Sequence, residues 1–170
     1  LKEPNEPVFF IQNRLGQNSK VFKCLKFRTM RSDQSFMNEF LCQNPDEAAY
    51  YAKYHKFIND PRISALGAFL RKSSLDEIPQ LINVLLGEMS LVGPRPYMVN
   101  ERHAMKGFLS EILLIRPGIT GLWQISGRSN TSFRSRLRID LLYIKNWSLL
   151  FDFEIMIKTI FAVLKGKGAS

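Results

Sequence analysis

The chain has 170 residues, of which 45% are apolar and 12% aromatic. This composition is typical of one globular domain and excludes a disordered or fibrous chain. The 24 Lys and Arg outnumber the 15 Asp and Glu, and the formal charge of +9 predicts an anionic partner. The longest stretch without a charged residue, 117–127, is too short to cross a bilayer. Cys24 and Cys42 are too few for a disulfide framework and favour a reducing, cytoplasmic setting.

The first predicted element in chain order is a β-hairpin. Apolar residues typical of strands occupy 8–12 and 21–30, and turn-forming residues separate them around 15–18. The composition then becomes polar and aromatic over 32–59, which Asn44-Pro45 interrupts, and the spacing suits two helices. We interpret residues 32–59 as a helical insert within the domain.

The remainder of the chain predicts further helices and one strand. The expected helices cover 63–70, 75–86, 97–115 and 133–165. Gly87 is expected to end the second of these as a C-cap residue, and 119–125 is expected to form a short strand. The predicted fold class is therefore mixed α/β and rich in helix, with a small N-terminal β-hairpin and several short helices.

Two adjacent carboxylates, Asp76 and Glu77, lie near the start of the expected helix 75–86. Ser74 and Glu77 have the spacing of a capping box, and a helix dipole would stabilise acids in any first turn, so local chemistry alone favours a structural role. Pro79 favours a cap at Asp76, because the proline then needs no backbone hydrogen bond. The functional alternative is a carboxylate nucleophile beside a metal-binding carboxylate, at a helix N-terminus that attracts phosphate.

The segment 93–96, Gly-Pro-Arg-Pro, holds the guanidinium of Arg95 between two prolines. An ordinary turn with a solvated charge accounts for this pattern. A rigid clamp for two phosphate oxygens accounts for it equally well. Further cations recur in nearby motifs, and they are Lys26, Arg28, Arg62, Arg71 and Lys72. Several converging cations would suit a diphosphate.

Asp140 and Tyr143 are three residues apart, so they would share one face of a helix. That face is directed either at a pocket or toward solvent. We include both residues among the candidate substrate-binding residues. The three arginines at 134, 136 and 138 are interpreted as a solvated basic face.

Residues 147–164 are apolar on almost every side, and Lys158, Lys165 and Lys167 lie toward the end of this stretch. Burial in the core is the ordinary explanation. The alternative is docking at a membrane surface, with the apolar side chains inserted and the lysines at anionic head groups.

Five stretches of the sequence resemble the bacterial sugar transferase family and cover nearly the whole chain in order. They are KFRTM (26–30), DPRIS (60–64), LRKSSLDEIPQLINVLLGEMSLVGPRP (70–96), RPGITGLWQISGRS (116–129) and IDLLYIKNWSLLFD (139–152). The family comprises polyprenyl-phosphate hexose-1-phosphate transferases, which are monotopic phosphoglycosyl transferases that begin exopolysaccharide, capsule and O-antigen synthesis. The insert 32–59 resembles that of the long members.

The resemblance implies one membrane-associated catalytic domain over residues 1–170, and we expect a membrane-inserting helix upstream of it. The implied reaction transfers a sugar 1-phosphate from a UDP-sugar, with UDP-galactose or UDP-glucose favoured, to undecaprenyl phosphate and releases UMP. The implied location is the cytoplasmic face of the bacterial inner membrane, on its anionic surface.

The resemblance also assigns roles to individual residues. Asp76 matches the nucleophile that forms an aspartyl phosphosugar, and Glu77 matches its partner; both are implied ligands of Mg²⁺. Phosphate-binding positions are matched by Arg71 and Arg95, and further candidates of this kind are Lys26 and Arg28.

Two other functions fit the basic charge less well. A nucleic-acid-binding module should show a recognised reader motif or a basic stripe with interleaved aromatic residues, and the sequence has neither, so no nucleic-acid partner is expected. The alternative within the same family is a catalytically inactive scaffold at the membrane surface. Exposed apolar surface near an upstream segment would also favour a homo-oligomer.

Overall fold

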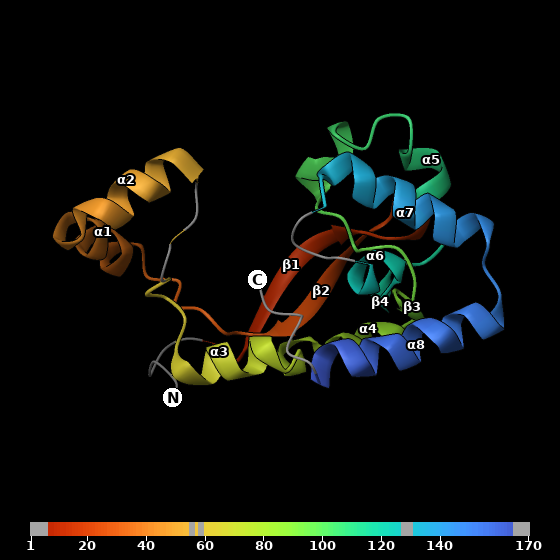
Figure 1. Ribbon diagram of the computed structural model, residues 1–170, viewed down its shortest axis with the longest axis horizontal. Helices are drawn as coiled ribbons and strands as arrows, with labels where there is room; N and C mark the ends of the chain where they lie inside the picture. Colours follow the sequence, from red (N-terminus) through yellow and green to blue (C-terminus); the bar gives the residue numbers. More distant parts are fainter. Residues whose placement is uncertain (1–6, 55–56, 58–59, 127–130, 165–170) are drawn as a thin grey trace.

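The computed structural model describes residues 7–54, 57, 60–126 and 131–164. Its centre is the predicted hairpin, in which β1 (Phe9–Leu15) pairs antiparallel with β2 (Val21–Phe27) across the turn η1 (Gln17–Ser19) (Figure 1). The hairpin prediction is confirmed, although the first strand runs further than expected and the second ends earlier. Leu15, Phe22 and Cys24 are buried and attach the hairpin to the core.

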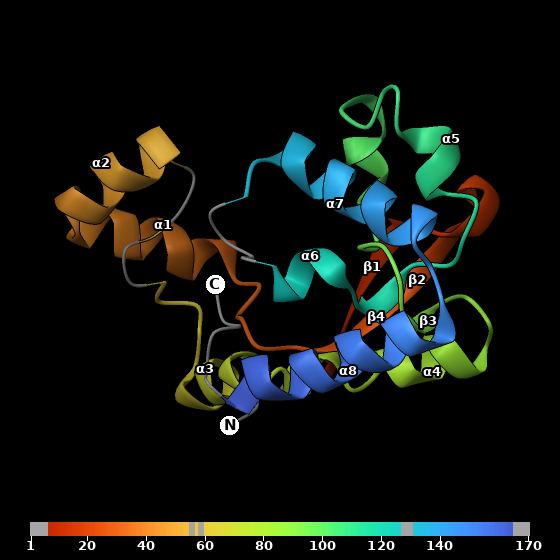
Figure 2. The same ribbon diagram turned by 45° about the vertical axis from the view of Figure 1, so that its right-hand side comes forward.

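The insert forms α1 (Gln34–Gln43) and α2 (Pro45–Tyr54), as expected. α1 begins after Asp33 because the carboxylate of that residue accepts hydrogen bonds from the backbone N–H groups of Ser35 and Phe36. Both views show the two helices packed together to one side of the hairpin (Figures 1 and 2). The last part of the insert, 55–56 and 58–59, lies outside the described residues.

Two short helices, α3 (Ala65–Lys72) and α4 (Gln80–Leu85), flank the carboxylate pair. The single helix expected over 75–86 is wrong, because the chain first forms the 3-10 turn η2 (Leu75–Glu77), and α4 begins only after Pro79. Proline has no N–H to continue a helix that started earlier, which explains the break. Gly87 has a φ of 75° and follows α4, as expected of a C-cap glycine.

The strands β3 (Ser90–Val92) and β4 (Gly118–Thr120) form a parallel pair. The sequence predicted no strand at β3. The two segments approach so closely that a Cβ atom on Gly93 would lie 2.7 Å from the backbone N of Gly118. Glycine is therefore required where the chain leaves β3, and this contact fixes the start of the loop that carries Arg95.

The helix expected over 97–115 is wrong. In its place are the short 3-10 helix η3 (Val99–His103) and one turn of helix, α5 (Leu109–Ile112). Gly107, with a φ of 89°, lies between them and breaks any continuous helix. The strand expected over 119–125 is also shorter than expected, because β4 ends at Thr120 and α6 (Leu122–Ile125) follows.

The single helical region expected over 133–165 is two helices, α7 (Phe133–Lys145) and α8 (Leu149–Leu164). Figures 1 and 2 both show α7 above and α8 below the β3–β4 pair. α7 completes the main core, which contains Leu15, Tyr97, Met105, Ile112, Leu113 and Leu137. Lys165 and Lys167 lie outside the described residues.

The helices α3, α4 and α8 lie along the lower edge of both views (Figures 1 and 2). Many apolar side chains on and beside these helices are exposed. We call these side chains the apolar surface; they are Leu66, Phe69, Ile78, Leu81, Ile82, Leu85, Leu86, Leu149, Leu150, Phe153, Ile157, Ile160, Phe161 and Leu164. Burial of the whole of 147–164 in the core, the ordinary expectation, is therefore wrong. Many exposed apolar side chains on helices at one edge of a protein are typical of an interaction site.

Within the described ranges, no helix combines the length and the apolar character that crossing a membrane requires.

Candidate active site

The carboxylate pair lies in a break between two helices. α3 ends at Lys72, Ser74 takes the left-handed conformation with a φ of 56°, and η2 then carries Asp76 and Glu77. The Ser74 side chain makes no capping hydrogen bond to η2, so the capping box expected from its spacing to Glu77 is wrong. A left-handed serine is uncommon and costs free energy. The purely structural explanation of the two acids therefore loses its main support.

Strand β2 brings Lys26 to this pair. The Lys26 Nζ lies 2.6 Å from Glu77 Oε1, and the two side chains are 30% and 25% exposed. Because both groups are largely shielded from water, their attraction is stronger than that of an exposed ion pair. The fold thus joins two predicted site residues that are 51 positions apart in the sequence.

Asp76 occupies a partly buried position among charges of both signs. Burial raises the pKa of Asp76 above its ordinary value, the Lys26 charge opposes this shift, Glu77 adds to it and Arg71 opposes it. Lys26 and Arg71, both predicted phosphate-binding residues, are thus close enough to act on this carboxylate. A carboxylate that burial has partly stripped of water is well prepared to attack an electrophile.

The guanidinium of Arg95 is enclosed by aromatic and acidic side chains. Its Cζ lies 5.8 Å from the ring centre of Tyr97 and 5.8 Å from that of Trp123. Arg95 Nη2 lies 3.8 Å from Glu101 Oε1. A solvated charge on an ordinary turn would lack these contacts, so the structure favours the rigid-arginine interpretation of the segment 93–96.

Arg14 on β1 is a further candidate site residue, which the sequence did not reveal. Its Nη1 donates to the carbonyl oxygen of Pro96 at 2.9 Å. Burial lowers the pKa of Arg14, and so does the nearby charge of Arg95, whereas Glu101 and Glu77 raise it. Arg14 therefore lies within electrostatic reach of both the Arg95 loop and the carboxylate pair. The alternation of side chains along the two strands could have indicated this position, since it puts Arg14 and Lys26 on the same face of the hairpin.

Asp140 and Tyr143 share one face of α7, but that face points into the protein. The two residues are 0% and 1% exposed, so the expectation that they face a pocket or solvent is wrong. Asp140 Oδ2 accepts hydrogen bonds from the Tyr97 hydroxyl at 2.7 Å and from the backbone N–H of Arg95 at 3.2 Å. The Tyr143 hydroxyl donates to Asp152 Oδ1 at 2.8 Å. Both side chains are thus engaged with protein groups.

Two other arginines, Arg28 and Arg136, contact protein groups that the sequence did not predict. The guanidinium of Arg28 donates to the carbonyl of Pro7 at 2.9 Å and to the hydroxyl of Ser32, so it contacts segments on either side of the hairpin. Arg136 is half-buried, and its Cζ lies 5.5 Å from the centre of the Trp123 ring, so it is not part of a solvated basic face. Substrate binding by Arg28 stays a prediction.

The donor set of the carboxylate pair fits Mg²⁺. Two adjacent carboxylates offer hard oxygen ligands. Because the described residues hold no group of three or more potential metal ligands, the remaining ligands would have to come from outside the protein. Mg²⁺ in phosphoryl-transfer sites is commonly held by one or two carboxylates together with substrate phosphates and water. The raised pKa of Asp76, caused first by burial, also marks a carboxylate whose charge a cation would stabilise.

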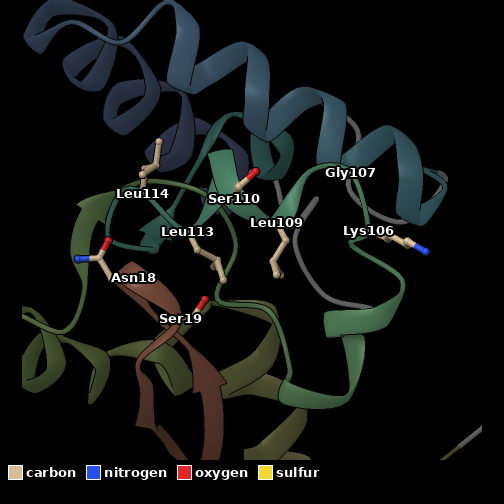
Figure 3. A pocket seen from close by; sticks show the side chains of 8 residues that line it. All are labelled: Asn18, Ser19, Lys106, Gly107, Leu109, Ser110, Leu113 and Leu114. Atoms are coloured by element: carbon tan, nitrogen blue, oxygen red, sulfur yellow. The ribbon is translucent and has the colours of Figure 1, made fainter.

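A cavity of about 250 Å³ lies beside Glu77, between η2, α4 and α8, and Asp76 is not among the residues that line it. Glu77 and Ser74 contribute polar groups to it, and Ile78, Leu81 and Val163 contribute apolar ones. A second hollow lies at the hairpin turn and α5 (Figure 3), and it contains none of the predicted site residues. The first cavity is therefore the one that belongs to the candidate active site.

Comparison with known proteins gives consistent results along the chain. The family described as bacterial sugar transferase matches residues 1–166. A sugar transferase of Haemophilus influenzae is 50% identical over 92% of this chain and 33% of its own length. The exopolysaccharide production protein ExoY of Rhizobium meliloti is 47% identical over 95% of this chain and 72% of its own length.

An undecaprenyl-phosphate galactose phosphotransferase of Salmonella typhimurium is 44% identical over 96% of this chain. The chain spans about a third of the length of the Haemophilus and Salmonella relatives. The family match extends from the hairpin through the carboxylate pair and the Arg95 loop to α8. The chain belongs to the bacterial sugar transferase family.

Proposed function

We propose that this domain transfers a hexose 1-phosphate from a UDP-sugar to undecaprenyl phosphate and releases UMP, with Asp76 as the nucleophile. The observation that carries the proposal is the partly buried Asp76, next to Glu77 and within reach of Lys26 and Arg71, at the edge of an exposed apolar surface. The name of the Salmonella relative supports the acceptor and favours galactose as the sugar.

In the first step, a carboxylate oxygen of Asp76 attacks the phosphorus that bears the sugar. The new bond joins this oxygen to phosphorus, and the phosphoanhydride bond to the uridine side breaks, so UMP leaves with the bonding electron pair. The product is an aspartyl phosphosugar. Arg71, whose charge acts on Asp76, offsets part of the negative charge that would otherwise repel the carboxylate, and Lys26 pairs with Glu77. Arg95 would bind the donor diphosphate.

In the second step, a phosphate oxygen of undecaprenyl phosphate attacks the same phosphorus. The bond between phosphorus and Asp76 breaks, which restores the carboxylate and leaves undecaprenyl-diphosphate-sugar. Asp76 and Glu77 would hold Mg²⁺, which when bound neutralises phosphate charge and polarises the phosphorus–oxygen bonds.

The apolar surface supports a lipid acceptor. Ile78 and Leu81 belong to this surface and also line the cavity that contains Glu77, so the carboxylate pair is continuous with exposed apolar side chains. A helix surface of this kind, with basic residues nearby, can lie in the interface of an anionic bilayer. The apolar surface supports the further proposal that the domain acts at a membrane surface, which the resemblance to the family implies is the cytoplasmic face of the bacterial inner membrane.

The test is UMP release from UDP-galactose, UDP-glucose and N-acetylated UDP-hexoses, with Mg²⁺ and undecaprenyl phosphate. We expect release from one donor, and we expect Asp76→Asn to abolish it while the melting temperature changes little. Glu111→Gln alters an exposed carboxylate on α5 and should leave the rate unchanged. Undiminished activity of a folded Asp76→Asn variant would refute the nucleophile assignment.

The alternative is an inactive scaffold that uses the apolar surface to bind membranes. It predicts binding to anionic vesicles together with no UMP release from any donor.

A further inference from the structure

The carboxylate of Asp140 lies where α7 meets the Arg95 loop. Its Oδ2 accepts from the Tyr97 hydroxyl at 2.7 Å and from the Arg95 backbone N–H at 3.2 Å. Its Oδ1 is buried and has no hydrogen-bond partner within the described part of the chain. One carboxylate oxygen thus binds two groups of the same loop, one on either side of Pro96.

Burial of the Asp140 carboxylate lowers the stability of the folded protein. Asp140 is 0% exposed, and burial raises its pKa to about 7, while the bonds from Tyr97 and Arg95 act in the opposite direction. An apolar residue would fit between Leu137 and Tyr143 on the same buried face of α7 without this cost. A buried, half-satisfied polar group therefore calls for an explanation outside packing.

The Arg95 loop is held from two sides. On the hairpin side, Arg14 Nη1 donates to the carbonyl of Pro96 at 2.9 Å, and the backbone N–H of Leu15 donates to the carbonyl of Tyr97 at 2.8 Å. On the α7 side, both hydrogen bonds end on Asp140. Loss of Asp140 would remove both of these hydrogen bonds, while the bonds to the hairpin and the edge-to-face contact of the Tyr97 ring with Phe133 of α7 would remain.

We propose that Asp140 is a positioning residue, which holds the loop through the Arg95 N–H and the Tyr97 hydroxyl so that the Arg95 guanidinium faces the donor diphosphate. Asp140 does not touch the substrate in this proposal and acts through Arg95. The proposal rests on the proposed function, because it assumes that Arg95 binds that diphosphate.

The test is a double-mutant cycle on UMP release from UDP-galactose, with wild type, Asp140→Ala, Arg95→Ala and the double variant. We expect Asp140→Ala to lower kcat/KM by about tenfold in the wild-type background and by less than about twofold in the Arg95→Ala background. A residue that acts only on overall folding would lower kcat/KM by the same factor in both backgrounds, and that result would overturn the proposal.

Conservative variants keep the test informative if Asp140→Ala folds poorly. Tyr97→Phe removes only the hydroxyl and enters the same cycle, with the same expected dependence on Arg95. Asp140→Asn retains an acceptor oxygen, so we expect its kcat/KM within about threefold of wild type. Ile112→Val disturbs the core cluster that contains Tyr97 but none of the loop's hydrogen bonds, and it should lower the melting temperature with kcat/KM unchanged.

Calorimetric measurement of UDP-galactose binding distinguishes a failure of the proposed function from a failure of the positioning role of Asp140. If the wild-type chain neither binds nor cleaves any UDP-sugar, the proposed function fails, and the positioning role fails with it. If wild type is active but the cycle is additive for both Asp140→Ala and Tyr97→Phe, only the positioning role is overturned.

Discussion

Of the two C-terminal helices, the one with more charged residues is the more deeply buried. α7 has five charged residues among thirteen, and α8 has three among sixteen. Yet α7 buries Leu137, Asp140 and Tyr143, whereas of the sixteen described residues of α8 only Ile155 is buried. Figure 2 shows α7 above the strand pairs and α8 at the lower edge of the molecule.

This difference shows that apolar content alone does not identify the core. α7 contributes one face to an interior that includes the buried carboxylate of Asp140, and it exposes Arg134, Arg138 and Lys145 to solvent. α8 uses little of its apolar character for folding, so the remainder is available to a partner. The helix that contacts the Arg95 loop through Asp140 and the helix that borders the cavity beside Glu77 therefore differ in how much of their surface the fold uses.

The largest expected contrast is in stability. Leu137→Ala removes a fully buried side chain from the main core and should lower the free energy of unfolding by about 2–5 kcal/mol. Leu150→Ala removes a side chain that is 81% exposed and should change that free energy by less than about 0.5 kcal/mol. Urea unfolding measures both. Equal losses would mean that α8 is already covered in the free protein.

The next effect is the pH dependence that Asp140 contributes. Its pKa is about 7 in the folded protein and about 3.9 when unfolded, so the folded state retains a proton that the unfolded state has lost between these values. Stability from this group is therefore highest near pH 4, falls as the pH rises to 7 and is constant above.

Asp140→Asn should remove this dependence, which is on the order of a few kcal/mol. Urea unfolding of wild type and variant at pH 5 and pH 8 measures it. We expect the stability of wild type relative to the variant to be greater at pH 5. The same difference at both pH values would contradict the raised pKa of Asp140.

The hairpin and the insert could be predicted because their signals are local. Apolar strand-forming residues on either side of a turn define β1 and β2, and Asn44-Pro45 separates the two insert helices. The β3–β4 pair could not be predicted, since strands of three residues show no periodicity. Its pairing depends on a contact between Val92 and Thr120 that only the folded chain creates.

The candidate site also combines features that local sequence predicts with features that only the fold creates. Asp76, Glu77 and Arg95 could be proposed because they lie in contiguous motifs that resemble the family, but the left-handed backbone of Ser74 could not, since serine seldom adopts it. Glu101 contacts Arg95 only through the 3-10 helix that replaced an expected α-helix. The burial of Asp140 followed from the packing of α7, which its spacing to Tyr143 could not specify.

A smaller effect should appear in membrane binding. Leu150→Ala and Phe161→Ala each remove an exposed apolar side chain from α8 and should each weaken association with phosphatidylglycerol vesicles by about tenfold or less. Leu114→Ala removes an apolar side chain that is 61% exposed beside α5 and serves as the control. Co-sedimentation measures the three variants. Equal weakening by the control would show that the contact is unspecific.

The smallest effect concerns the ion pair on α8. Lys158 Nζ donates to Glu154 Oε1 one helical turn away, and the two side chains are 56% and 53% exposed. Water and salt screen such a pair, so a double-mutant cycle of Glu154→Gln and Lys158→Gln should give a coupling free energy below about 0.5 kcal/mol. The coupling should shrink further in 0.5 M salt. A coupling above about 1 kcal/mol that resists salt would mean that this part of α8 is shielded from water in solution, for example by a second copy of the chain. The difference in exposure between α7 and α8 would then hold only for the isolated chain.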